Sequence, residues 1–259
     1  MIPTAVEAAK SCLANGAGEL VRMYTDSALL LNSCDVAAKG YAARTDNFQL
    51  STTSNISGEL RLPLEIEVVF HRHQLPAVYA DRVLQRVSED FLIRLVSVID
   101  AVLEDIYEAV LPLVSSNLPE AEIAKRVRLA WQQDDNGHVK LLNYLVVEAG
   151  LLSPKGRRST LQMVFDRYYE MREVRHSLVH NAGVLSPKHL ARLKLLAGRL
   201  PEDIRHGSLA SAKFLESGAV RLTVPDILSL RHWAYLTVIG YLQTAFTESS
   251  DTYNSPAEF

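Results

Sequence analysis

The sequence predicts an all-α protein: a helical bundle with an N-terminal extension and one short extended or hairpin element. Two observations predict this class. Apolar residues recur every three or four positions along two long stretches, about 78–113 and 225–248, and shorter stretches with the same period lie between them. Hydrophobic residues also make up 48% of the 259 residues, which is ample for a core. We therefore expect helices packed on helices.

Residues 1–75 are predicted to form the N-terminal extension with a loop or insertion. Residues 3–32 have the pattern of one or two helices, which we expect to break or bend at Asn15–Gly18 because two glycines stand there. A short helix is expected at 35–44 and a Ser-, Thr- and Asn-rich loop at 45–59. Residues 60–70 alternate between apolar and charged side chains, which predicts a strand or an extended segment.

Residues 76–248 are predicted to form the bundle, and 249–259 a disordered tail. The first long helix covers 78–113 and is expected to stop near Pro112. Its apolar stripe consists of Leu84, Val87, Phe91, Leu95, Val98, Val102, Ile106 and Val110. Further helices are expected at 120–133, 138–149, 159–181, 187–199 and 225–248, with a small hairpin at 214–222.

The composition favours a cytoplasmic protein with no membrane segment. Cys12 and Cys34 form neither a CxxC pair nor a disulfide framework, which is typical of a reducing compartment. Glu7 and Lys10 interrupt the apolar core that a signal peptide would need. The most apolar stretch, 224–246, carries charged and polar residues and therefore fits a buried amphipathic helix better than a membrane span.

The candidate chemistry lies at 175–183, where the sequence reads Arg-His-Ser-Leu-Val-His-Asn-Ala-Gly. Arg175 belongs to a helical stripe that also contains Val164, Tyr168, Met171, Leu178 and Ala182, so its neighbours predict that it points inward. Burying an unpaired guanidinium costs several kcal/mol, so Arg175 needs an anionic or hydrogen-bonding partner in the protein or in a ligand. Gly183 is expected to end the helix, and Ser186 and Pro187 to begin the next one.

This run has the form R-x4-H, followed by Asn181 and Gly183, and it resembles the signature of the HEPN superfamily. The resemblance implies an all-α domain that acts as a metal-independent endoribonuclease in toxin–antitoxin or other defence systems. It implies Arg175 and His180 as catalytic residues, with His176 and Asn181 in support, and no cofactor. It also implies RNA as substrate, a homodimer, and an antitoxin or regulatory protein as a further partner.

The residue types fit RNA cleavage. His180 can move a proton while the 2′-hydroxyl attacks the adjacent phosphorus, and Arg175 can offset charge on the transition state. Five residues at about 100° each place the two side chains about 140° apart on a regular helix, so one chain does not easily bring both to one phosphate. Two copies facing each other across a two-fold axis could do so, which agrees with the homodimer that the resemblance implies.

Three other interpretations of the run remain open. His176 and His180 share a helical face, as in zinc proteases, but Ser177 stands where HExxH requires Glu and no third ligand is evident, so no metal is predicted. Ser177 also lacks the elbow motif of a nucleophilic serine. Alternatively, the run is structural in a non-catalytic interaction or dimerisation protein, in which His180 and Asn181 cap the helix and Arg175 pairs with an acid of the long helix, namely Asp100, Glu104 or Asp105.

Positive charge is concentrated around this run. Residues 155–194 contain nine basic and three acidic residues, a net +6, whereas the remainder of the chain sums to −9. Phosphate binding depends on local potential more than on the net charge of −3. The predicted RNA-binding residues are Lys155, Arg157, Arg158 and Arg172, and the alternative is an ordinary solvated face.

Overall fold

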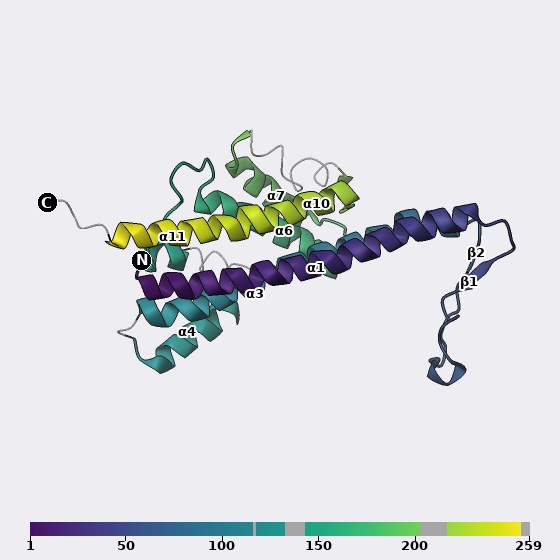
Figure 1. Ribbon diagram of the computed structural model, residues 1–259, viewed down its shortest axis with the longest axis horizontal. Helices are drawn as coiled ribbons and strands as arrows, with labels where there is room; N and C mark the ends of the chain where they lie inside the picture. Colours follow the sequence, from purple (N-terminus) through teal and green to yellow (C-terminus); the bar gives the residue numbers. More distant parts are fainter. Residues whose placement is uncertain (116–117, 133–142, 203–216, 255–259) are drawn as a thin grey trace.

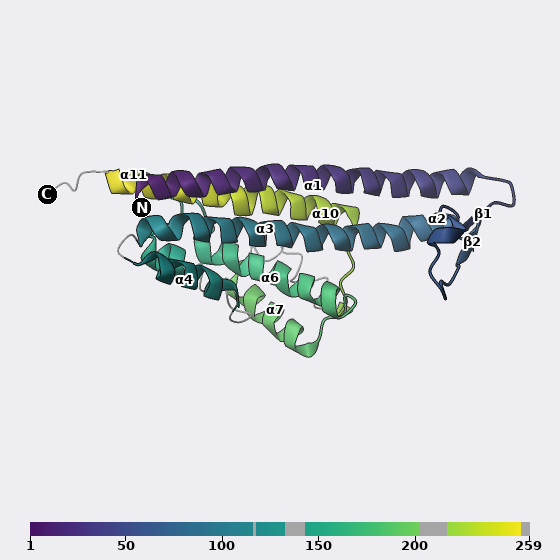
Figure 2. The ribbon, with the colours of Figure 1, turned by 90° about the horizontal axis from the view of Figure 1, so that it is seen from below.

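The computed structural model describes residues 1–115, 118–132, 143–202 and 217–254, which form a bundle of helices (Figures 1 and 2). The all-α class is therefore confirmed. The helices are α1 (Pro3–Ala43), α2 (Leu75–Ala77), α3 (Leu84–Val114), α4 (Glu120–Gln132), α6 (Leu161–His180), α7 (Pro187–Arg199), α10 (Val224–His232) and α11 (Gly240–Asn254). Short π-helical segments are η2 (Val78–Val83), η3 (Tyr144–Glu148) and η4 (Trp233–Ile239), and η1 (Gly58–Leu60) is a 3₁₀ turn.

Helix α3 lies at the centre of the bundle. Helix α1 runs along one side of it together with α10 and α11, and α6 packs on the other side with α7 beyond it (Figure 2). The predicted stripe of α3 is buried at Phe91, Leu95 and Val102, but Leu92 and Ile99, which lie outside that stripe, are buried too. Because α3 is covered on more than one side, its buried surface is wider than a single amphipathic stripe.

Helix α1 is continuous, so of the break or bend predicted at Asn15–Gly18 the break does not occur, and the separate helix predicted at 35–44 is part of α1. Gly16 has a role in packing instead. A Cβ atom on Gly16 would lie 2.2 Å from Cγ2 of Val102, so the missing side chain lets α1 and α3 approach closely. The long-range contact with α3 outweighs the weak helix propensity of glycine.

The predicted division at residue 75 does not separate two cores. Ala9, Leu13 and Met23 of α1 are buried in the same hydrophobic cluster as the residues of α3. The N-terminal amine also donates a hydrogen bond to the carbonyl of Ser249 in α11, at 3.0 Å. Thus α1 is an integral helix of the bundle rather than an extension of it.

The extended element is a narrow arm between α1 and α2. Strands β1 (Gln49–Ser51) and β2 (Val69–His71) pair antiparallel, and the arm projects from the end of the bundle away from the N-terminus (Figure 1). Of the segment 60–70, predicted as a strand or an extended segment, only the last two residues belong to a strand. Its apolar side chains are exposed instead, up to 98% for Leu64, because they have no core face to pack against.

Other boundaries differ from the predictions in detail. Pro112 lies inside α3, which ends two residues later. The helix predicted at 138–149 is described only as η3, because 133–142 lie outside the described residues. Part of the hairpin predicted at 214–222 also lies outside them, and Ala219 pairs with Val184 rather than within a local hairpin. The last helix continues to Asn254, so the first part of the predicted tail is helical, and 255–259 are not described.

Candidate functional site

The R-x4-H run forms the C-terminal end of α6 and the turn into α7. Helix α6 begins at its N-cap Thr160, whose hydroxyl accepts a hydrogen bond from the Met163 amide. It ends as predicted near Gly183, which has a φ of +79° and donates its amide to the carbonyl of Ser177 at 3.0 Å. Ser186 then caps α7 by accepting a hydrogen bond from the His189 amide. The motif thus lies at the tip of a helical hairpin.

Two ion pairs fix α7 along α6. Arg192 Nη1 lies 2.9 Å from a carboxylate oxygen of Glu173, and Arg199 Nη1 lies 3.4 Å from the buried carboxylate of Asp166. Arg199 comes after Arg192 in α7, but its partner Asp166 comes before Glu173 in α6. The two helices therefore run antiparallel. This register places the first turn of α7 beside the last turns of α6.

Three histidines meet at that point. The ring centroids of His176 and His180 are 4.5 Å apart, and those of His176 and His189 are 5.0 Å apart. His176 and His180 are exposed, whereas His189 is buried. Both predicted histidines of α6 therefore lie on an accessible surface with a third imidazole packed against His176.

His189 was not identified from the sequence. Its Nδ1 lies 3.1 Å from the Ser186 hydroxyl, and its Nε2 lies 4.0 Å from a carboxylate oxygen of Glu173. The ring is therefore held between a hydroxyl on one side and a carboxylate on the other. The only local signal was its position in the first turn after the predicted cap at Ser186, and its approach to His176 depends on how α7 packs on α6.

Arg175 lies on a different face of α6. It is partly buried, and its Nε has no hydrogen-bond partner among the described residues. Burial raises the pKa of the Asp100 carboxyl, while the positive charges of Arg172 and Arg175 and a hydrogen bond from the Tyr168 hydroxyl act to lower it. Arg175 is thus close enough to α3 to influence Asp100, as its inward position predicted.

Asp100, the acid whose pKa Arg175 helps to lower, already has other partners. Nε of Arg172 lies 3.5 Å from Oδ1 of Asp100, and the hydroxyl of Tyr168 donates to the same oxygen. In the described part of the chain no carboxylate lies within ion-pair distance of Arg175, including Asp100, Glu104 and Asp105. The predicted structural ion pair of Arg175 is therefore not formed, and its guanidinium retains donors for another acceptor.

Within one chain, Arg175 and His180 do not share a site. Arg175 approaches the Asp100 side of α3, whereas the His180 ring lies against His176 at an interplanar angle of 47°, and His176 also contacts His189 of α7. This agrees with the separation expected for residues five apart on a helix. Asn181, the C-cap residue of α6, is exposed next to His180.

The predicted RNA-binding residues do not form one patch with the motif. Lys155, Arg157 and Arg158 are exposed in the loop before α6, whereas His180 ends that helix. Because α6 has 20 residues, the two positions are about 30 Å apart. Arg172, the fourth residue, is half-buried and pairs with Asp100, so its charge is largely balanced within the protein.

In the part of the chain that the structure describes, no group of three or more His, Cys, Asp or Glu side chains is arranged to hold a metal ion. Likewise, no helix among the described residues is long and apolar enough to cross a membrane. Comparisons with models of known protein families, with characterised proteins and with solved structures found no match to this chain.

Proposed function

We propose that this protein is a HEPN-type, metal-independent endoribonuclease that acts in the cytoplasm as a toxin or defence effector. The observation that supports the proposal is the exposure and charge pairing of the side chains in the R-x4-H run. His180 and His176 are exposed at the end of α6, and Arg175 has a partly buried guanidinium without an acidic partner in the described structure. An open histidine surface and an uncompensated guanidinium suit an anionic substrate better than a sealed structural role.

His180 is the proton-transfer residue in this mechanism. The 2′-hydroxyl of the RNA attacks the adjacent phosphorus and loses its proton, the bond to the 5′-oxygen breaks, and that oxygen gains a proton. The products are a 2′,3′-cyclic phosphate and a 5′-hydroxyl end. Arg175 offsets the charge on the phosphoryl oxygens as the transition state forms.

Because Arg175 and His180 of one chain point in different directions, the mechanism requires a composite site made from two subunits. In a two-fold dimer whose α6 ends approach each other, Arg175 of one subunit can reach the phosphate on which His180 of the other subunit acts. RNA then lies across the dimer, with the exposed loop of Lys155, Arg157 and Arg158 available for phosphates farther along the strand.

The experiment is an RNA-cleavage assay of the wild type and a His180→Ala variant in the presence of EDTA. We expect the variant to lose activity by about 10²-fold or more, because a general acid–base group contributes that much. His73→Ala, which removes an exposed histidine from the distant arm, is the matched control and should retain activity. Full activity of a well-folded His180→Ala protein would contradict the mechanism, and restoration of EDTA-inhibited cleavage by zinc would favour a metal site instead.

A second candidate is a non-catalytic helical interaction protein. The electrostatic attraction between Arg175 and Asp100 favours it, because this attraction supports the packing of α6 on α3. The same assay separates the two candidates. A wild-type protein that never cleaves RNA, but loses folding stability on Arg175→Ala substitution, fits the interaction protein.

A further inference from the structure

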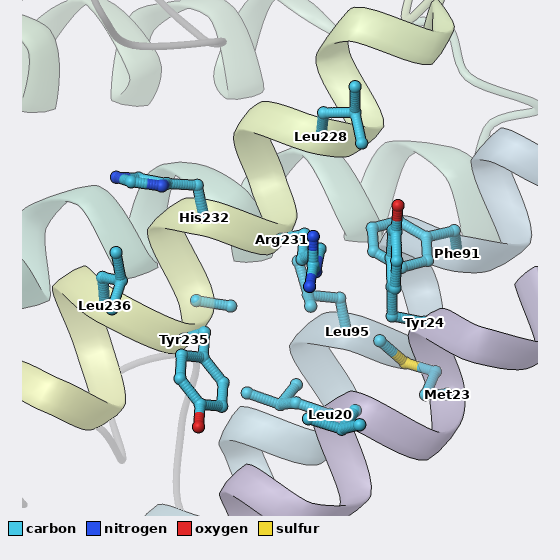
Figure 3. Close-up of a pocket in the computed structure, with 12 residues that line it drawn as sticks. Leu20, Met23, Tyr24, Phe91, Leu95, Leu228, Arg231, His232, Tyr235 and Leu236 are labelled. Carbon is cyan, nitrogen blue, oxygen red and sulfur yellow. The ribbon is translucent and has the colours of Figure 1, made fainter. Parts of the chain in front are cut away.

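A second concave site lies on the other side of α3 from α6. It is a cavity of about 430 Å³ between α1, α3 and the C-terminal helix formed by α10 and η4 (Figure 3). This volume lies within the usual range for small-molecule sites, roughly 300 to 1,000 Å³. None of the residues that we assign to RNA cleavage lines it, so the two sites are separate.

The cavity has an apolar floor and an apolar rim. Leu20, Met23 and Phe91 are buried at its floor, whereas Leu228 and Leu236 at its edge are about half exposed, at 47% and 53%. Leaving such surface in water is unfavourable by about 25 cal/mol for each Å². The continuity from buried to exposed apolar surface therefore favours a hydrophobic body entering from solvent.

The charged side chain of the cavity, Arg231, is positive. Arg231 and His232 both line it, and none of the described residues around it is acidic. The guanidinium carbon of Arg231 lies 4.1 Å from the ring centroid of Tyr24, so the guanidinium stacks on that ring (Figure 3). Stacking fixes the group by its face and leaves the N–H donors at its edge free for a carboxylate.

The wall that carries Arg231 has an unusual backbone. Directly after His232, the helix changes to the π-helical segment η4, which runs from Trp233 to Ile239. Three successive residues of this region, Ala234, Tyr235 and Leu236, line the cavity. Short π-helical segments occur frequently at functional sites. Here the segment coincides with the cavity wall.

We propose that this cavity binds an anionic amphiphile of the fatty-acid class. The alkyl chain packs between Leu20, Phe91 and Leu236, and the carboxylate lies at the edge of the cavity against the guanidinium of Arg231. An apolar floor selects the chain, and a guanidinium with no acid among the residues that line the cavity selects the charge of the head group.

Calorimetric titration of the full chain with laurate, below its micelle concentration, tests this proposal. We expect saturable binding of one laurate per chain, no binding of acetate, and binding of dodecanol at least about tenfold weaker because it lacks the charge. Arg231→Gln should weaken laurate binding about tenfold or more and leave dodecanol binding unchanged.

A second variant tests the location of the site. Leu236→Glu places a carboxylate on the exposed rim and should abolish laurate binding with little effect on folding. Leu195→Glu, at a 57% exposed leucine of α7 that does not line the cavity, is the matched control and should bind as the wild type does. Absence of saturable laurate binding, equal affinity for laurate and dodecanol, or unchanged binding by Leu236→Glu would each overturn the proposal.

Discussion

Gly16 and His189 have roles that depend on residues far away in the sequence. Gly16 is separated from Val102 by most of α1, the arm and half of α3, yet the two residues touch. His189 lies on a different helix from His176 and His180 but completes their cluster. At both positions the residue type is explained by a tertiary neighbour rather than by the local pattern.

Gly16→Ala should destabilise the protein by about 1–2 kcal/mol, because overpacking costs more than the gain in helix propensity. Gly18→Ala is the matched control. Its nearest neighbour would be the flexible end of Arg22 at 3.9 Å, so this change should be neutral or stabilise by up to about 1 kcal/mol. Urea denaturation of both variants measures the difference.

A rescue experiment checks the cause. Adding Val102→Ala to Gly16→Ala removes the methyl group that the new Cβ would meet. The double variant should therefore lose less stability than the two single variants together. Strict additivity would show that the contact between α1 and α3 is not what requires glycine.

We expect His189 to position His176 and His180 without contacting the substrate. His189→Asn should therefore lower kcat for RNA cleavage by roughly tenfold and change KM little. Asparagine can still hydrogen-bond to Ser186 but presents no ring to His176. The pH dependence of kcat should also change, because Glu173 and Arg192 would face the α6 histidines without an intervening imidazole. A loss of folded protein with unchanged kinetics of the remainder would show a purely structural role.

At the scale of elements, α6 connects two surfaces with different tasks. Its C-terminal end carries the histidine cluster, and the loop before its N-terminus carries Lys155, Arg157 and Arg158. The backbone of that loop is itself held in place, because the Lys155 amide donates to a carboxylate oxygen of Glu248 at 2.7 Å. A rigid helix between the two surfaces fixes their spacing, so binding and cleavage can be altered separately.

Replacing Lys155, Arg157 and Arg158 together by Gln should weaken RNA binding. The slope of log affinity against log salt concentration should become shallower, by the amount that corresponds to the loss of up to about three phosphate contacts. Cleavage at saturating RNA should persist, because the histidines are about 30 Å away. Fluorescence anisotropy over a salt series measures the slope. Neutralising Lys10, Arg22 and Lys39 on α1 in the same way controls for the loss of three positive charges, and equal slopes in all proteins would argue for a solvated loop.

At the scale of the whole molecule, α1 and the C-terminal helix pack on one side of α3, and the hairpin of α6 and α7 packs on the other side (Figure 2). The motif is therefore at the periphery of the bundle, where a second copy can approach it. Because Arg175 and His180 of one chain point in different directions, the proposed chemistry requires the second copy.

Mixing Arg175→Ala and His180→Ala subunits tests the composite site. If each site takes its arginine from one subunit and its histidine from the other, a mixed dimer has one intact site and one empty site. We expect mixing to restore up to about a quarter of wild-type activity, because random exchange makes half of the dimers mixed. Homodimers of either variant are the controls, and no recovery despite proven subunit exchange would mean that both groups act within one chain.

The sequence by itself determined the helical class, the bounds of α4, α6 and α7 to within a few residues, and the inward position of Arg175. These features depend on neighbours within about one helical turn, so periodicity and capping residues are sufficient to predict them. The tertiary structure alone decided that α1 passes unbroken through its glycines, that 60–68 remain exposed, and that His189 joins His176. Each depends on which surfaces meet when the helices pack, and no local pattern encodes that choice.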